Sequence, residues 1–77
     1  MPEVNEGQHV VPKQHLMGNT PMMETLKRRT GLSADELASG RIKVRRIDEE
    51  GHAVMAHPDL TEPFICHSKF FEPAPQR

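Results

Sequence analysis

The segment RIKVRRIDEE, from Arg41 to Glu50, limits what this chain can fold into more than any other stretch. It follows a helix-forming region, so a winged helix-turn-helix protein would need it as the DNA-reading helix. Its apolar residues Ile42, Val44 and Ile47 are two and three positions apart, which does not produce the wide stripe of a packed helix. These three residues are also β-branched, which favours an extended backbone. The segment therefore predicts a strand.

The strand is predicted to continue into a β-hairpin. Glu49, Glu50 and Gly51 suit a three-residue loop with Gly51 in the left-handed conformation. This register places Asp48 opposite His52, Arg46 opposite Val54, and Val44 opposite Ala56. The predicted buried face then holds Ile42, Val44, Val54 and Ala56, and the other face holds Arg41, Lys43, Arg45, Met55 and His57.

Two short helices are predicted before the hairpin. The first has Thr20 as its N-cap and Pro21 at its first position, and it runs to about Thr30, where Gly31 ends it.

The second helix begins with a capping box formed by Ser33 and Glu36, the most specific local signal in the chain. Leu32 and Leu37 flank the cap as a hydrophobic staple. The helix is predicted over residues 34–39, with Gly40 as its left-handed end.

The run FICHSKFF, residues 64–71, predicts a third strand with Phe64, Cys66 and Phe70 on one side. Residues 1–19 lack a sustained period and predict a flexible arm, and the proline-containing residues 72–77 predict a flexible tail. Residues 20–71 are predicted to form a single small domain. The expected fold class is α+β, with the short helix pair packed on a three-stranded antiparallel sheet.

A chain of 77 residues buries a small fraction of its surface, and only 16 of these residues are Leu, Ile, Val or Phe. Such a thin core predicts stabilisation by a protein contact. The single cysteine, Cys66, excludes an intramolecular disulfide, and no apolar run approaches the length of a membrane span. The N-terminus lacks the pattern of a signal peptide, so a cytoplasmic location without membrane association is expected.

Enzyme, cofactor and metal functions are not expected from the residue pattern. The sequence contains no glycine-rich phosphate loop and no nucleophile elbow. Five histidines invite a metal hypothesis, but no paired spacing of the C-x-x-C or H-x-x-x-H kind is present. His52 and His57 are five apart and would face opposite sides of a strand. Cys66 lies in an apolar run, where a small core residue is expected rather than a nucleophile.

A basic segment, residues 27–46, gives one of two functional hypotheses. Seven of the ten Lys and Arg residues lie in it, against only Asp35 and Glu36. Phosphate contacts of a nucleic-acid-binding regulator would use such a cluster, although the pI near 6.5 and the absence of Trp and Tyr argue against this function. The candidate contacts are Lys27, Arg28, Arg29, Arg41, Lys43 and Arg45.

The leading hypothesis is a non-enzymatic protein-interaction module, an accessory or regulatory subunit that binds a larger protein or itself. The methionines Met17, Met22 and Met23 in HLMGNTPMM carry this hypothesis. Their flexible thioethers adapt to irregular partner surfaces, and a small core cannot cover all of them.

Overall fold

The computed structural model describes residues 4–75, which form five strands and three α-helices. Residues 1–3 and 76–77 of the predicted arm and tail lie outside the described part of the chain. In chain order, the elements are β1 (His9–Pro12), α1 (Gln14–Met17), α2 (Thr20–Thr30), α3 (Ala34–Leu37), β2 (Ile42–Ile47), β3 (His52–Ala56), β4 (Phe64–His67), the 3-10 helix η1 (Ser68–Phe70) and β5 (Phe71–Pro73).

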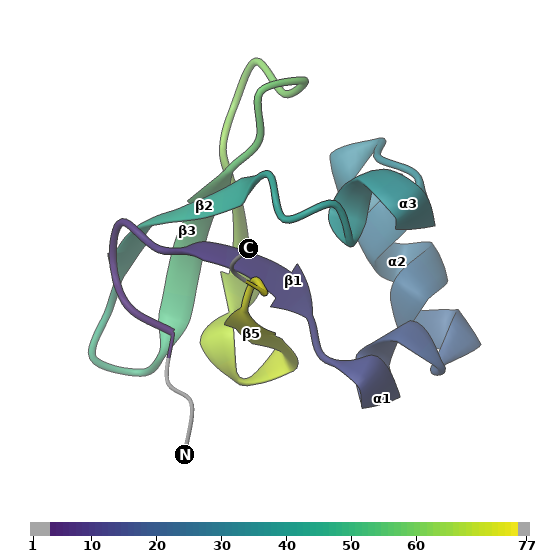
Figure 1. The fold of residues 1–77 in the computed structure, drawn as a ribbon, viewed down its shortest axis with the longest axis horizontal. Coiled ribbons are helices and arrows are strands. Elements are labelled where there is room, and N and C mark those ends of the chain that lie inside the picture. The colour runs from purple at the N-terminus through teal and green to yellow at the C-terminus, as the bar shows by residue number, and fades with distance from the viewer. Residues whose placement is uncertain (1–3, 76–77) are drawn as a thin grey trace.

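The strands form one antiparallel sheet in the order β4-β3-β2-β1-β5, and the helices lie together beside it (Figure 1). The α+β class is therefore confirmed, but the predicted three-stranded sheet is wrong because the sheet has five strands. The additional strands come from segments expected to be irregular. β1 and α1 come from the predicted arm, so three α-helices replace the predicted pair, and β5 continues into the predicted tail.

β1 joins β5 to the rest of the sheet, because it pairs with β2 on one side and with β5 on the other. Val10 lies opposite Ile42 of β2 and opposite Pro73 of β5, and its side chain is fully buried. The run FICHSKFF is not one strand, because η1 divides it into β4 and β5. His67 ends β4 by accepting a hydrogen bond on Nδ1 from the backbone N–H of Lys69, at 3.0 Å. The chain therefore turns at η1 and returns to pair with β1.

The predicted hairpin exists, and its tip is as expected. Gly51 has a φ of +91°, in the left-handed region. The Asp48 carboxylate accepts hydrogen bonds from the backbone N–H groups of Glu50 and His52, at 2.8 and 2.9 Å. The hydrogen bond from His52 has the largest effect on the pKa of Asp48. Both bonds lower this pKa, because they favour the charged carboxylate.

The register of the hairpin changes partway along β2. Arg46 lies opposite Val54, as predicted, but Val44 lies opposite Met55 and not Ala56. The shift makes Arg45 the additional residue of a β-bulge.

The bulge turns the other face of β3 toward the core. Val54 and Ala56 are half-buried, whereas Ala53, Met55 and His57 are buried. The predicted buried face was therefore right for Ile42 and Val44 and wrong for β3, where Met55 and His57 were expected outside. Arg41, Lys43 and Arg45 are exposed, as predicted.

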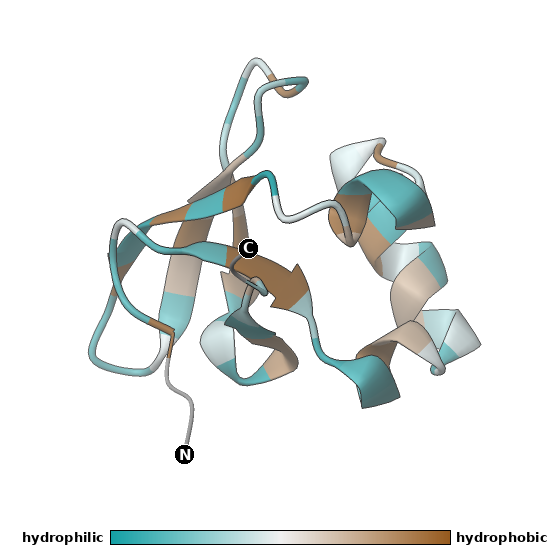
Figure 2. Ribbon diagram, in the orientation of Figure 1, coloured by the Kyte–Doolittle hydropathy of each residue, from teal (hydrophilic) through white to brown (hydrophobic). Residues whose placement is uncertain are grey.

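One hydrophobic core joins the sheet to the helices, and Figure 2 shows hydrophobic residues in both layers. The sheet contributes Val10, Ile42, Val44, Ala53, Met55, Phe64 and Phe71, and the helical region contributes Leu16, Met23, Leu26, Leu32 and Leu37. No helix among the described residues combines the length and the apolar character needed to cross a membrane.

The helix starts follow the local sequence signals with one shift, but α3 ends at Leu37, two residues before its predicted end, with Ala38 and not Gly40 after it. Asn19, not Thr20, is the N-cap of α2, because its side chain accepts a hydrogen bond from the Met22 N–H at 3.2 Å. Gly31 ends α2 with a φ of +75°, as predicted. Ser33 caps α3 by accepting from the Glu36 N–H at 3.2 Å.

Replacing Ser33 with alanine is expected to lower the free energy of unfolding by about 1 kcal/mol, because the Glu36 N–H loses its hydrogen-bond acceptor. Urea denaturation followed by circular dichroism measures the change. Asp35→Ala, which removes an exposed side chain from the same turn, is the control. An unchanged midpoint for Ser33→Ala would contradict the capping role.

Candidate functional site

An apolar groove of about 310 Å³ lies between α2, β4 and η1. Side chains on one face of α2 form one wall, since they are spaced three and four positions apart. The lining residues are Leu16, Pro21, Met22, Thr25, Leu26, Arg29, Cys66 and Phe70. We call this feature the α2–β4 groove.

One charged residue, Arg29, lies in the lining of the groove. Its Nη1 donates a hydrogen bond to the backbone carbonyl of Ile65 at 3.1 Å. Lys69 lies with its Nζ 5.2 Å from the centre of the Phe70 ring. Ile65 is a large hydrophobic residue, and 55% of it is exposed. No other large hydrophobic residue is exposed among those that the structure describes. The groove thus combines apolar walls with the cation of Arg29.

Cys66 contributes apolar surface to the groove and not a nucleophile. Burial raises the pKa of its thiol, and this effect exceeds the opposing effects of the His67 backbone hydrogen bond and the Arg29 charge. The thiol therefore stays protonated at neutral pH and packs as a small hydrophobic group.

The three candidate methionines have different positions. Met22 lines the groove and is half-buried. Met23 is buried in the core, and Met17 packs against that core. Only Met22 of the three therefore contributes to the groove. Sequence reasoning did not name Thr25, and it named Arg29 only as a candidate phosphate contact, although their spacing along α2 from Met22, three and seven positions, is a helical signal.

The basic candidates do not form one free surface. Lys27 pairs with Glu24 at 3.0 Å, and Arg29 bonds to the backbone of β4. Arg41 contacts two carboxylates. Arg28 is exposed on α2, while Lys43 and Arg45 are exposed on β2, where they line a separate shallow pocket.

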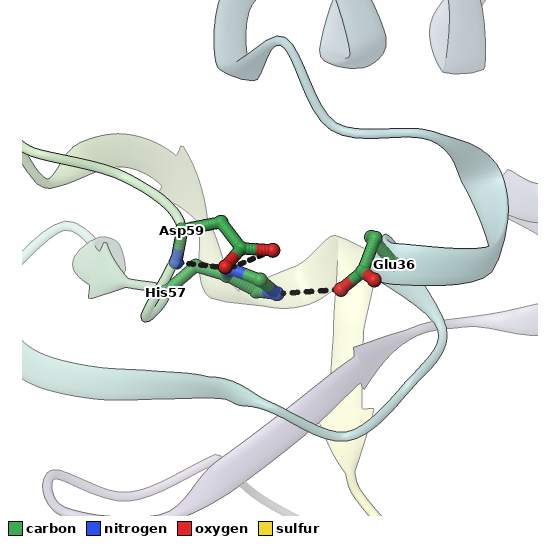
Figure 3. Close-up of side chains that lie close together, drawn as sticks. All are labelled: Glu36, His57 and Asp59. Carbon is green, nitrogen blue, oxygen red and sulfur yellow. Dashed lines mark hydrogen bonds and ion pairs between the residues drawn. The ribbon is translucent and has the colours of Figure 1, made fainter.

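A second cluster joins α3 to the turn after β3. It contains Glu36, His57 and Asp59, which Figure 3 shows with the imidazole ring between the two carboxylates. One potential metal-ligand atom from each residue lies within 4.8 Å of the others. The guanidinium of Arg41 lies beside both acids, with Nη1 3.4 Å from Oε2 of Glu36 and 3.9 Å from Oδ2 of Asp59.

His57 occupies the centre of this cluster, and its side chain is fully shielded from solvent. Nδ1 accepts a hydrogen bond from the Asp59 N–H at 3.0 Å. Nε2 lies 3.2 Å from Oε2 of Glu36, close enough for an ion pair, but the orientation is not that of a hydrogen bond. Nε2 is therefore a buried nitrogen without a hydrogen-bond partner among the described residues.

Sequence reasoning did not find this cluster, because its members are 21 and 2 positions apart and come together only in the folded chain. The β-bulge was also unexpected, and it buries the strand face that ends at His57. Comparison with family models, curated proteins and solved structures gives no match to this chain. Its function has to be inferred from its own residues.

Proposed function

We propose that the chain is a non-enzymatic protein-interaction module, an accessory or regulatory subunit that docks a partner protein in the α2–β4 groove. The observation that carries this proposal is the apolar groove with Met22 in its wall. Its volume is near the lower end of the range for binding pockets, about 300–1,000 Å³, which suits one or two large side chains of a partner segment. Met22 and Phe70 supply the adaptable and aromatic surfaces that anchor such segments.

The charge of Arg29 defines the partner further. Arg29 lies in the lining beside the apolar wall, so the complementary segment carries a large apolar side chain next to an aspartate or glutamate. A second copy of the chain fits less well. Its own acidic tip, Asp48–Glu50, carries no large exposed hydrophobic residue.

Peptides selected from a random displayed library on the immobilised chain are expected to combine a large apolar residue with an acidic one. Met22→Glu is expected to weaken binding of these peptides at least about tenfold, because it places a negative charge in the apolar wall. The matched control is Arg28→Glu, which changes an exposed residue of α2 outside the groove lining. Isothermal titration calorimetry with each variant measures the affinities.

Equal binding to wild type and Met22→Glu would overturn the groove as the docking site. Self-association is read from the melting temperature, which would rise with protein concentration in a Met22-dependent way if a second copy fills the groove. That result would replace the larger partner with a homo-oligomer.

The alternative is a nucleic-acid-binding regulator, favoured by the exposed cations of Arg28, Lys43 and Arg45. Phosphate contacts lose affinity steeply as salt rises. Retention on DNA or RNA at 50 mM salt that disappears at about 200 mM, together with indifference to Met22→Glu, would support this function over the protein-binding one.

A further inference from the structure

We propose that Glu36, His57 and Asp59 form a zinc-binding site, which we call the Glu36–His57–Asp59 site. The cluster is built from α3 and from the turn that follows β3, and it does not share a residue with the α2–β4 groove. Its function is therefore independent of protein docking in that groove.

The buried nitrogen of His57 points to a ligand. Its side chain is fully shielded, and Nε2 has no hydrogen-bond partner among the described residues. Buried polar atoms in folded proteins are nearly always satisfied, and an unsatisfied one often faces an ion. Nε2 is 3.2 Å from Oε2 of Glu36. Two ligands on one tetrahedral zinc, each bonded at about 2.0–2.2 Å, are separated by about 3.4 Å.

The donor set selects zinc over the alkaline-earth ions. One imidazole nitrogen with two carboxylates is a borderline-soft set, whereas calcium and magnesium prefer oxygen ligands alone. The two carboxylates also balance the double positive charge. Three protein ligands leave the fourth zinc position to water, as in open zinc sites.

Arg41 competes with the ion in the metal-free chain. Its guanidinium lies beside both carboxylates, at 3.4 and 3.9 Å, and its side chain is 47% exposed. The long side chain reaches the cluster from solvent and can return to solvent when zinc enters. Removing this cation therefore strengthens zinc binding.

The hydrogen bond from the Asp59 N–H to Nδ1 assigns the ring proton of neutral His57 to Nε2. A zinc ligand at Nε2 needs the other tautomer, with the ring proton on Nδ1, so the Asp59 N–H has to move away from Nδ1 when zinc binds. The same movement frees Asp59, whose side chain is 54% exposed, to turn its carboxylate toward the metal.

Titration of the full chain with zinc chloride at pH 7 tests the site by calorimetry and by thermal unfolding. One zinc per chain is expected. When free zinc is about ten times the dissociation constant, the melting temperature is expected to rise by about 6–11 °C. Glu36→Gln, which keeps the side-chain shape, is expected to weaken zinc affinity at least about tenfold, and Arg41→Gln to strengthen it. Calcium and magnesium chloride are expected to leave the melting temperature unchanged.

His52→Gln is the matched control, because His52 belongs to a different acidic cluster with Asp48 and Glu50, each 3.6 Å away. Zinc affinity of His52→Gln should equal that of the wild type. Loss of binding in His52→Gln but not in Glu36→Gln would overturn the proposal, as would a dissociation constant weaker than about 1 mM. The zinc affinity of both variants is measured by equilibrium binding. A Glu36→Gln chain that folds but does not bind zinc therefore still gives a decisive result.

Discussion

Replacing Met55 with glutamate is expected to unfold the chain, whereas the same substitution at the neighbouring Val54 is expected to change its stability by less than about 1 kcal/mol. Met55 is fully buried and lies opposite Val44 in the core. A carboxylate there loses its hydration without gaining a partner, and the methionine contacts are lost as well, so the cost exceeds about 4 kcal/mol. That is most of the stability of a small domain, which is about 5–15 kcal/mol.

Val54 has the opposite environment because of the bulge at Arg45. It is half-buried and lies opposite Arg46, so a glutamate at this position gains a cationic cross-strand neighbour. Met55→Leu, which nearly conserves volume, is the control for packing alone and should cost less than about 1.5 kcal/mol. Urea unfolding measured by circular dichroism ranks the three variants. A tolerated Met55→Glu with an unfolded Val54→Glu would mean that the hairpin has the straight register.

Phe71→Ala is expected to lower the free energy of unfolding by about 3–5 kcal/mol, because it removes one of the largest fully buried side chains. Phe71 begins β5 and lies opposite Pro12 of β1. Its loss therefore leaves a cavity where the two end segments of the described chain meet. Thermal and urea unfolding measure the effect.

Glu72→Ala is the control for the same strand, since Glu72 is only half-buried and is not part of the hydrophobic core. A cost below about 1 kcal/mol is expected for this change. If Phe71→Ala were as mild as Glu72→Ala, β5 would not be an integral strand of the domain.

Local sequence signals predicted the parts of the fold that depend on neighbouring residues. The Ser33 cap, the Gly31 helix end and the Gly51 turn each need only a few adjacent positions. The pairing of β1 with β5 depends on residues 59–63 positions apart, and the four residues HVVP carry no strong alternation. Periodicity within a short window therefore did not find these two strands.

The bulge shows a different reason for failure. Ile42, Val44 and Ile47 have spacings of two and then three, and this change of period coincides with the additional residue at Arg45. The spacing was used only to exclude a helix. Applied to the register, it would have placed Val44 opposite Met55 and buried the strand face that ends at His57.

The candidate sites were predicted unevenly for the same reason. Met22 was named from local composition, and it lines the groove. Cys66 and Phe70 lie far from Met22 in the sequence. Their place in the groove depends on how β4 and η1 fold against α2, which no short window of sequence shows.

The pairing of β1 on both of its sides has a consequence during protein synthesis. Val10 pairs with Pro73, a residue 63 positions later, so β1 gains its second neighbour only after nearly the whole described chain has been made. Until then, one edge of β1 presents unpaired backbone groups, which are a template for pairing with other chains. Non-local strand pairing of this kind also slows folding. A product truncated before Phe71 would keep that edge of β1 unpaired, so it is expected to aggregate more readily than the full chain.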